Sequence, residues 1–122
     1  MMPIKKILVV DDSPTERLAL SEVLVRNGYQ VVTAESGEEA ISKSRTELPD
    51  LILMDVVMPG MNGYQATRTI SRDEQTRSIP IIMCTSKGLE TDKIWGMRQG
   101  AFDYMVKPVD HDALIARIKR IG

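Results

Sequence analysis

Apolar residues along the chain gather in five short runs separated by segments of mixed polarity. Each run is rich in Val, Ile, Leu or Met and is bounded by polar, Gly or Pro residues. Short, nearly continuous apolar runs of this kind are typical of strands buried on both faces of a sheet. The pattern predicts five strands, over 4–10, 29–34, 51–54, 79–84 and 102–106.

The segments between the runs predict helices. Ser13 with Glu16 has the spacing of a capping box, and Pro14 would occupy the first helical position. Ser36 with Glu39 has the same spacing, and Asp110 is suited to an N-cap. Apolar residues then recur at helical spacing, as in the last segment with Leu114, Ile115, Ile118 and Ile121. We expect helices over 14–26, 36–46, 64–73, 90–99 and 111–121.

Five strands that alternate with five helices predict an α/β protein with a doubly wound, flavodoxin-like (βα)5 fold. Its five-stranded parallel sheet would have the strand order 2-1-3-4-5, with helices on both faces. The 122 residues suit one core. We therefore expect a single domain over 1–122 without an attached output domain.

Composition narrows the function classes. Sixteen basic and seventeen acidic residues give a net charge of -1, and no basic stripe is present, so nucleic-acid binding has no electrostatic support. The single cysteine, Cys84, excludes an intrachain disulfide. The apolar run near the N-terminus is too short for a signal peptide or a membrane span. The sequence predicts a cytoplasmic protein that does not insert into membranes.

Polar residues that can carry chemistry follow four of the five predicted strands. Asp11 and Asp12 follow the first strand, Asp55 the third, Thr85 the fourth and Lys107 the fifth. In a doubly wound sheet, ligands bind outside the carboxyl ends of the strands. With the order 2-1-3-4-5, we expect these five side chains to converge at one rim.

Such a group of side chains suggests phosphoryl chemistry. Three close carboxylates repel one another, and a divalent cation relieves the repulsion. Oxygen ligands without nearby His or Cys suit Mg²⁺. A lysine ammonium and a threonine hydroxyl suit a phosphate-like oxygen, so Lys107 and Thr85 would assist phosphoryl transfer onto the carboxylate of Asp55.

These residues lie in four ordered segments, VVDDSP, LILMDVVMPGMNG, IIMCTSK and YMVKP, which resemble the signature segments of bacterial response-regulator receiver domains. The resemblance covers essentially the whole chain. It implies that Asp55 is the phosphoacceptor and that the ligands of Mg²⁺ are Asp11, Asp12, Asp55 and the backbone carbonyl of Val57. It also implies a phosphate-binding role for Lys107, switch roles for Thr85 and Tyr104, and a cis peptide bond before Pro108.

The same resemblance implies partners. A histidine kinase would donate the phosphoryl group, and a downstream target protein would bind the face formed by the fourth helix, fifth strand and fifth helix. The chain would be a signalling receiver, not an enzyme acting on external substrates. The segment SKGLETDKIWGMRQGA followed by DYMVKP is similar to single-domain regulators of the chemotaxis-like systems that control type IV pilus twitching.

Other functions remain alternatives. A Mg²⁺-dependent aspartyl-phosphate hydrolase would need an acidic residue two positions after the nucleophile, where this chain has Val57. A flavin-binding module would need a Ser/Thr-rich phosphate loop where this chain has DDSPTE. A phosphate sink or an interaction module is a further alternative. For single residues, we expect Cys84 in the core and His111 on the surface, whereas Trp95 could be buried or an exposed anchor for a partner.

Overall fold

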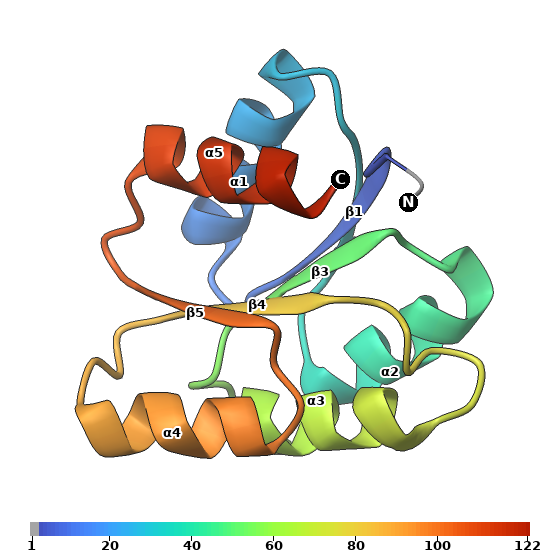
Figure 1. Cartoon of the computed structure of the whole chain (residues 1–122), viewed down its shortest axis with the longest axis vertical. Helices are drawn as coiled ribbons and strands as arrows, with labels where there is room; N and C mark the ends of the chain where they lie inside the picture. Colours follow the sequence, from blue (N-terminus) through green and yellow to red (C-terminus); the bar gives the residue numbers. More distant parts are fainter. Residues whose placement is uncertain (1–2) are drawn as a thin grey trace.

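The computed structural model describes residues 3–122 and contains five strands and five helices in strict alternation (Figure 1). All ten predicted elements are present, with boundaries that differ from the prediction by at most two residues. None of the helices in this described part is long and apolar enough to cross a membrane. In chain order the elements are β1 (Lys6–Val10), α1 (Pro14–Arg26), β2 (Gln30–Ala34), α2 (Gly37–Glu47), β3 (Leu51–Met54), α3 (Gly63–Arg72), β4 (Ile81–Thr85), α4 (Glu90–Arg98), β5 (Asp103–Val106) and α5 (His111–Ile121).

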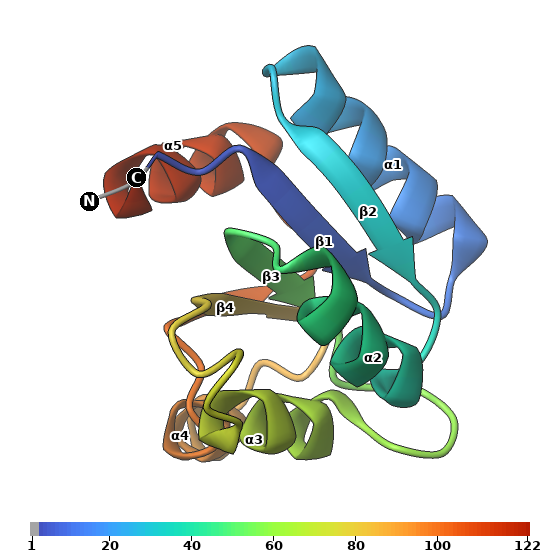
Figure 2. The ribbon, with the colours of Figure 1, turned by 90° about the vertical axis from the view of Figure 1, so that its right-hand side faces the viewer.

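The strands form one parallel sheet with the order β2-β1-β3-β4-β5, as predicted. Helices α1 and α5 cover one face, and α2, α3 and α4 cover the other (Figures 1 and 2). Because both faces are covered, β1, β3 and β4 are buried almost throughout. This explains why their sequences are continuous apolar runs without a polar alternation.

Side chains that alternate along each strand divide the core into two layers. In β1, Ile7 and Val9 pack with Leu24 of α1, whereas Leu8 and Val10 pack on the other side of the sheet. The second layer receives Ala40 from α2 and Ala66 and Ile70 from α3. The small residues of α2 and α3 allow these helices to lie close to the sheet.

Ser13, Ser36 and Asp110 cap α1, α2 and α5 as predicted. Neither predicted capping box is complete, however: at α2 the carboxylate of Glu39 accepts from the N–H of Glu35 and not from that of Ser36, and at α1 the box is likewise only half formed. The Ser13 hydroxyl accepts from the backbone N–H of Glu16, as expected. The Glu16 side chain does not return this bond, because the N–H of Ser13 donates to a carboxylate oxygen of Asp11 instead. The carboxylate of Glu16 is therefore free to act elsewhere. A complete capping box, between Asn62 and Gln65, begins α3.

The strand register brings the two central acidic positions together. Val10 of β1 lies beside Met54 of β3, so the next residues, Asp11 and Asp55, are neighbours where the two strands end. The N–H of Asp55 donates to the carbonyl oxygen of Val10 at 3.0 Å, which extends the pairing to this point. The sheet itself thus fixes the spacing of these two carboxylates.

Candidate functional site

A hollow at the carboxyl ends of the strands contains most of the predicted site residues. It is open to solvent and lies between the loops that follow β1, β3, β4 and β5. This is the rim at which doubly wound folds bind ligands. The residues that line it are Asp12, Glu16, Asp55, Val57, Ser86, Lys107 and Pro108.

Three carboxylates form the acidic part of the site. Asp11, Asp12 and Asp55 each offer an oxygen atom, and these three atoms lie within 4.8 Å of one another. Asp11 and Asp55 are buried, whereas Asp12 is exposed. The cluster therefore has a fixed inner pair and an outer carboxylate that faces the solvent.

Asp55 is the carboxylate whose charge is most costly. Burial raises its pKa from 3.8 to about 6, and the negative charge of Asp11 adds to the rise. The ammonium of Lys107 and the backbone N–H groups of Val56 and Val57 act in the opposite direction but do not cancel the rise. One oxygen of Asp55 accepts from the N–H of Val56 at 2.8 Å, which orients the carboxylate toward the hollow.

Lys107 supplies the positive charge of the site. Its Nζ lies 2.9 Å from a carboxylate oxygen of Asp11, 2.8 Å from one of Glu16 and 3.6 Å from one of Asp55. Burial alone would lower the pKa of this lysine, but the carboxylates of Glu16, Asp11 and Asp55 outweigh burial and raise it, so the ammonium stays charged. The peptide bond between Lys107 and Pro108 is cis, as the resemblance implied.

The donor set of the cluster fits a hard divalent cation. All of its side-chain donors are carboxylate oxygens, and a cation would offset both the burial of Asp55, which is the main cause of its raised pKa, and the repulsion of Asp55 by Asp11. Asp11, Asp12 and Asp55 are the residues that would hold such an ion. Val57 lines the same hollow, which is compatible with a contribution from its backbone carbonyl.

The loop between β3 and α3 needs glycine where its backbone contacts that of Asp55. A Cβ atom on Gly63 would collide with the carbonyl oxygen of Asp55, so only glycine lets α3 begin this close to the acidic cluster. Gly60 has a φ of 73°, a conformation that residues with side chains rarely adopt. These two positions explain the turn residues that precede α3.

Thr85 and Tyr104 belong to one hydrogen-bonded chain that leads away from the hollow. Thr85 is fully buried, and its hydroxyl accepts from the N–H of Lys87 at 3.3 Å. The carbonyl of Lys87 accepts from the Tyr104 hydroxyl at 2.7 Å. Thr85 itself does not line the hollow, where Ser86 lies instead. The switch roles of Thr85 and Tyr104 remain predictions, but the two side chains are connected through Lys87.

Tyr64 extends this chain to α4 and was not identified from the sequence. Its hydroxyl donates to the backbone carbonyl of Asp92 at 3.2 Å and lies 3.4 Å from the Tyr104 hydroxyl. Burial and the adjacent Tyr64 hydroxyl raise the pKa of Tyr104 well above that of a free tyrosine. Gly96 of α4 packs on the Tyr104 ring, where a Cβ would lie only 3.0 Å from it. The feature of the sequence that could have indicated this role is an aromatic residue directly after Gly63, at the start of the third helix.

The remaining candidates lie outside the hollow. Cys84 is buried in the core as expected, and burial raises the pKa of its thiol to about 12, so it stays protonated. His111 is exposed at the first position of α5. Trp95 is 49% exposed on α4, which favours the surface over the core.

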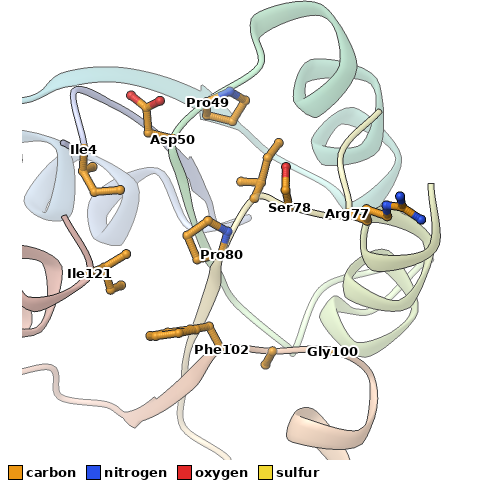
Figure 3. A pocket seen from close by; sticks show the side chains of 11 residues that line it. Ile4, Pro49, Asp50, Arg77, Ser78, Pro80, Gly100, Phe102 and Ile121 are labelled. Carbon is orange, nitrogen blue, oxygen red and sulfur yellow. The ribbon is translucent and has the colours of Figure 1, made fainter. Parts of the chain in front are cut away.

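Another hollow, of about 600 Å³, lies at the opposite rim, near the amino ends of the strands (Figure 3). Ile4, Pro80, Phe102 and Ile121 give it an apolar lining. Its one carboxylate, Asp50, accepts from the backbone N–H groups of Lys5 and Lys6, so it is already used to hold the start of β1. This rim therefore brings together no set of reactive groups comparable to that around Asp55.

A doubly wound sheet with an acidic cluster, a buried aspartate and a lysine at its carboxyl rim defines a receiver domain of two-component signalling. Residues 7–119 match the response regulator receiver domain, and the chain belongs to this family. The family assignment covers all five side chains that the sequence had singled out.

Individual relatives agree with this assignment. The chain is 51% identical to the protein PilH of Pseudomonas aeruginosa over 116 residues. The matched region covers 95% of this chain and 96% of PilH. The structure of the Vibrio cholerae chemotaxis protein CheY4 is 34% identical, with a TM-score of 0.91 over 98% of this chain and 99% of CheY4. A CheX-CheY-BeF3-Mg²⁺ complex from Borrelia burgdorferi contains a chain that is 27% identical, with a TM-score of 0.90 over 96% of this chain and 88% of that one. The chain spans about half the length of the transcriptional regulatory proteins that it also matches.

Proposed function

We propose that Asp55 accepts a phosphoryl group from the phosphohistidine of a histidine kinase. In this step an oxygen of the Asp55 carboxylate forms a bond to phosphorus while the bond between phosphorus and the histidine nitrogen breaks, and the nitrogen keeps the electron pair. The observation that carries the proposal is the position of Asp55, buried at the base of a solvent-open hollow with Lys107 beside it. Such positioning and charge neutralisation supply most of the catalysis of phosphoryl transfer.

Mg²⁺ is the proposed cofactor, and Asp11, Asp12, Asp55 and the Val57 carbonyl are its proposed ligands. When bound, the ion would neutralise charge on the phosphoryl oxygens and on the acidic cluster. The chain's own residues do the rest. Lys107 supplies a fixed ammonium for a phosphoryl oxygen, and the backbone N–H of Val56 orients the carboxylate.

The phosphoryl group would change partner binding through the chain from Thr85 to Tyr104. If the Thr85 hydroxyl turns toward the phosphoryl group, its hydrogen bond to Lys87 is lost, and the position of Tyr104 against α4 changes with it. Such a change shifts a population only if the phosphoryl group interacts differently with the two arrangements. The switch roles of Thr85 and Tyr104 are part of the proposal.

The face formed by α4, β5 and α5 is the proposed binding surface for a downstream target protein. Large apolar side chains are exposed on and beside α4, and exposed aromatic residues of this kind are common binding hot spots. They are Leu89, Ile94, Trp95, Met97 and Val106. The identity to PilH supports an output in pilus or chemotaxis-type control, which the α4 segment had already suggested.

Mass spectrometry after incubation with acetyl phosphate and Mg²⁺ tests the proposal. We expect one added phosphoryl group, absent in Asp55→Asn and absent with EDTA. Asp50→Asn is the matched control, since it removes a carboxylate at the other end of β3, and it should accept the group like the wild type. An adduct that survives in Asp55→Asn would contradict the assignment.

The hydrolase alternative predicts a different readout. A hydrolase would release phosphate from small phosphate esters at a steady rate, whereas a receiver would form at most one acyl phosphate per chain. No acidic side chain stands at the position of Val57, two residues after Asp55, so no acid/base is available there for repeated turnover. Steady phosphate release from several esters would overturn the receiver proposal in favour of the hydrolase.

A further inference from the structure

Glu16 makes the shortest of the three carboxylate contacts of Lys107, although no step of the proposed transfer uses it. Its oxygen lies 2.8 Å from Nζ of Lys107, compared with 3.6 Å for the nearest oxygen of Asp55. Glu16 comes from the first turn of α1 and lines the hollow together with Asp12 and Asp55. The lysine is thus held toward α1, closer to Glu16 and Asp11 than to the phosphoacceptor.

The side chain of Glu16 is not needed to begin α1. The capping hydroxyl of Ser13 bonds to the backbone N–H of Glu16, and the N–H of Ser13 bonds to Asp11. The polar groups at the helix start are therefore paired without the Glu16 carboxylate. Glu16 is also about half exposed, so a neutral amide of the same shape can replace it without a buried charge being left behind.

A phosphoryl group on Asp55 and the Glu16 carboxylate would compete for the same ammonium. Lys107 has three N–H donors, and two of them now point to Glu16 and Asp11. Glu16 is negatively charged and lines the same hollow that an anionic phosphodonor must enter. Both effects oppose the arrival of the phosphoryl group.

Because this step presupposes phosphorylation of Asp55, the inference rests on the proposed function. We infer that Glu16 is a positioning residue that draws the ammonium of Lys107 toward α1, so that it lies 3.6 Å from Asp55, and that Glu16 thereby slows phosphoryl uptake from small anionic donors. It thereby favours a donor whose binding energy comes from contacts outside the hollow, such as a protein carrying phosphohistidine. For a donor such as acetyl phosphate, the bond between phosphorus and the carboxylate of Asp55 forms as the bond to the acetate oxygen breaks, and acetate leaves with the electron pair.

The test compares Glu16→Gln with wild type in the rate of phosphorylation by acetyl phosphate at saturating Mg²⁺. We expect Glu16→Gln to react about three- to tenfold faster at low salt, the size expected for loss of a partly exposed ion pair and a repulsive charge. The gain should shrink as the salt concentration rises, because exposed charges are screened. Glu22→Gln is the matched control, since it makes the same charge change on the exposed side of α1 and should react like the wild type.

Two further measurements separate positioning from a structural role. Glu16→Asp keeps the charge but shortens the side chain, so a direct contact with Lys107 is lost and the rate should rise toward that of Glu16→Gln. Beryllofluoride binding with Mg²⁺, measured by calorimetry, should tighten in Glu16→Gln and stay unchanged in Glu22→Gln. A purely structural role would alter the unfolding midpoint without a salt-dependent change in rate or a tighter anion complex.

The outcomes distinguish this inference from the proposed function. If wild type takes up a phosphoryl group on Asp55 and Glu16→Gln reacts at the same rate or more slowly, the role of Glu16 is wrong and the receiver function stands. If Glu16→Asp is phosphorylated by acetyl phosphate at the same rate as wild type, the contact between Glu16 and Lys107 is not the cause of the slow uptake. If wild type takes up no phosphoryl group on Asp55 from any donor, the proposed function fails and this inference fails with it.

Discussion

Asp50 and Asp55 lie on either side of β3, at opposite rims of the same sheet, and their carboxylates have opposite roles. Asp50 accepts two backbone hydrogen bonds, from Lys5 and Lys6, each at 2.9 Å. Asp55 is buried, repelled by Asp11 and has a pKa raised to about 6. Asp50 pairs with backbone N–H groups that would otherwise lack a partner, whereas Asp55 carries its charge at neutral pH although burial disfavours that charge.

The difference shows how one parallel sheet separates stability from chemistry. At the amino rim, Pro49 and Pro80 from the loops before β3 and β4 and Ile121 from the end of α5 line a hollow that is mostly apolar. At the carboxyl rim, β1, β3 and β5 are followed by charged residues, and these are incompletely paired with one another. Unfavourable burial of charge is typical of functional sites, because the ligand supplies the missing partner. The comparison therefore predicts that replacing Asp50 or Asp55 by asparagine will change stability in opposite directions.

The largest expected effect is on stability in Asp55→Asn without metal. Between pH 4 and pH 6 the folded chain keeps a proton on Asp55 that the unfolded chain releases, so the free energy of unfolding of wild type falls as pH rises through this window. A shift from 3.8 to about 6 corresponds to about 3 kcal/mol above pH 6. Asparagine does not ionise, so Asp55→Asn should lack this decline and be more stable by about that amount at pH 7 in urea unfolding with EDTA.

Asp50→Asn is the matched control for this measurement. It replaces charge-assisted hydrogen bonds to Lys5 and Lys6 by neutral ones, so we expect a loss of about 1 kcal/mol at pH 7. The two asparagine variants should therefore lie on opposite sides of wild type. If Asp55→Asn shows the same decline with pH as wild type, burial does not raise the pKa of Asp55 and the contrast between the rims is wrong.

A slightly smaller effect is expected from Mg²⁺. An ion that binds only the folded chain stabilises it by about 2.7 kcal/mol at 100 times its Kd. We expect the thermal midpoint of wild type to rise with Mg²⁺ at pH 7, because the ion relieves repulsion among Asp11, Asp12 and Asp55. Asp12→Asn should lose most of this rise. Asp50→Asn should keep it, and an equal rise in both variants would place the ion outside the acidic cluster.

Much of this contrast could be predicted from the sequence because strand ends are marked by abrupt changes from apolar to charged residues. The order of the elements predicted the sheet, and the sheet order placed Asp11, Asp12, Asp55 and Lys107 at one rim. Asp55 and Asp11 are buried because the ends of β1 and β3 pair side by side. This pairing depends on the strand register, which the sequence alone does not give. The fold and the acidic cluster could therefore be predicted from the sequence, but the burial of the two carboxylates and the raised pKa of Asp55 could not.

What the sequence did not predict depends on side chains that choose among several partners. Glu16 has the spacing of a capping box, yet Asp11 takes the N–H of Ser13 and Glu16 binds Lys107. Tyr64 lies directly after Gly63, and only its packing in one buried cluster with Met83 and Tyr104 of the sheet brings its hydroxyl to that of Tyr104. Local spacing gives each of these residues several possible partners, and tertiary packing selects one.

The smallest expected effect on stability comes from two exposed apolar side chains, one at each rim. Phe102 borders the hollow at the amino rim and is 57% exposed, and Val57 borders the hollow beside Asp55 and is 56% exposed. Because more than half of each side chain is already in water, Phe102→Ala and Val57→Ala should each lower the free energy of unfolding by less than about 1 kcal/mol.

The two substitutions should differ in their effect on the acyl phosphate of Asp55. Val57→Ala opens the hollow around Asp55 to water and should shorten the lifetime of phosphorylated Asp55 several-fold, measured as loss of the added mass after the donor is removed.

Phe102→Ala should leave that lifetime unchanged, because its side chain lies at the far end of the sheet from the acyl phosphate. Equal lifetimes in Val57→Ala and wild type would mean that the side chain of Val57 does not limit access of water to Asp55. A shorter lifetime in Phe102→Ala would mean that the apolar hollow influences the chemistry at Asp55 through the sheet. The separation of the two rims, on which the contrast between Asp50 and Asp55 depends, would then be wrong, because a change at the structural rim would reach the reactive one.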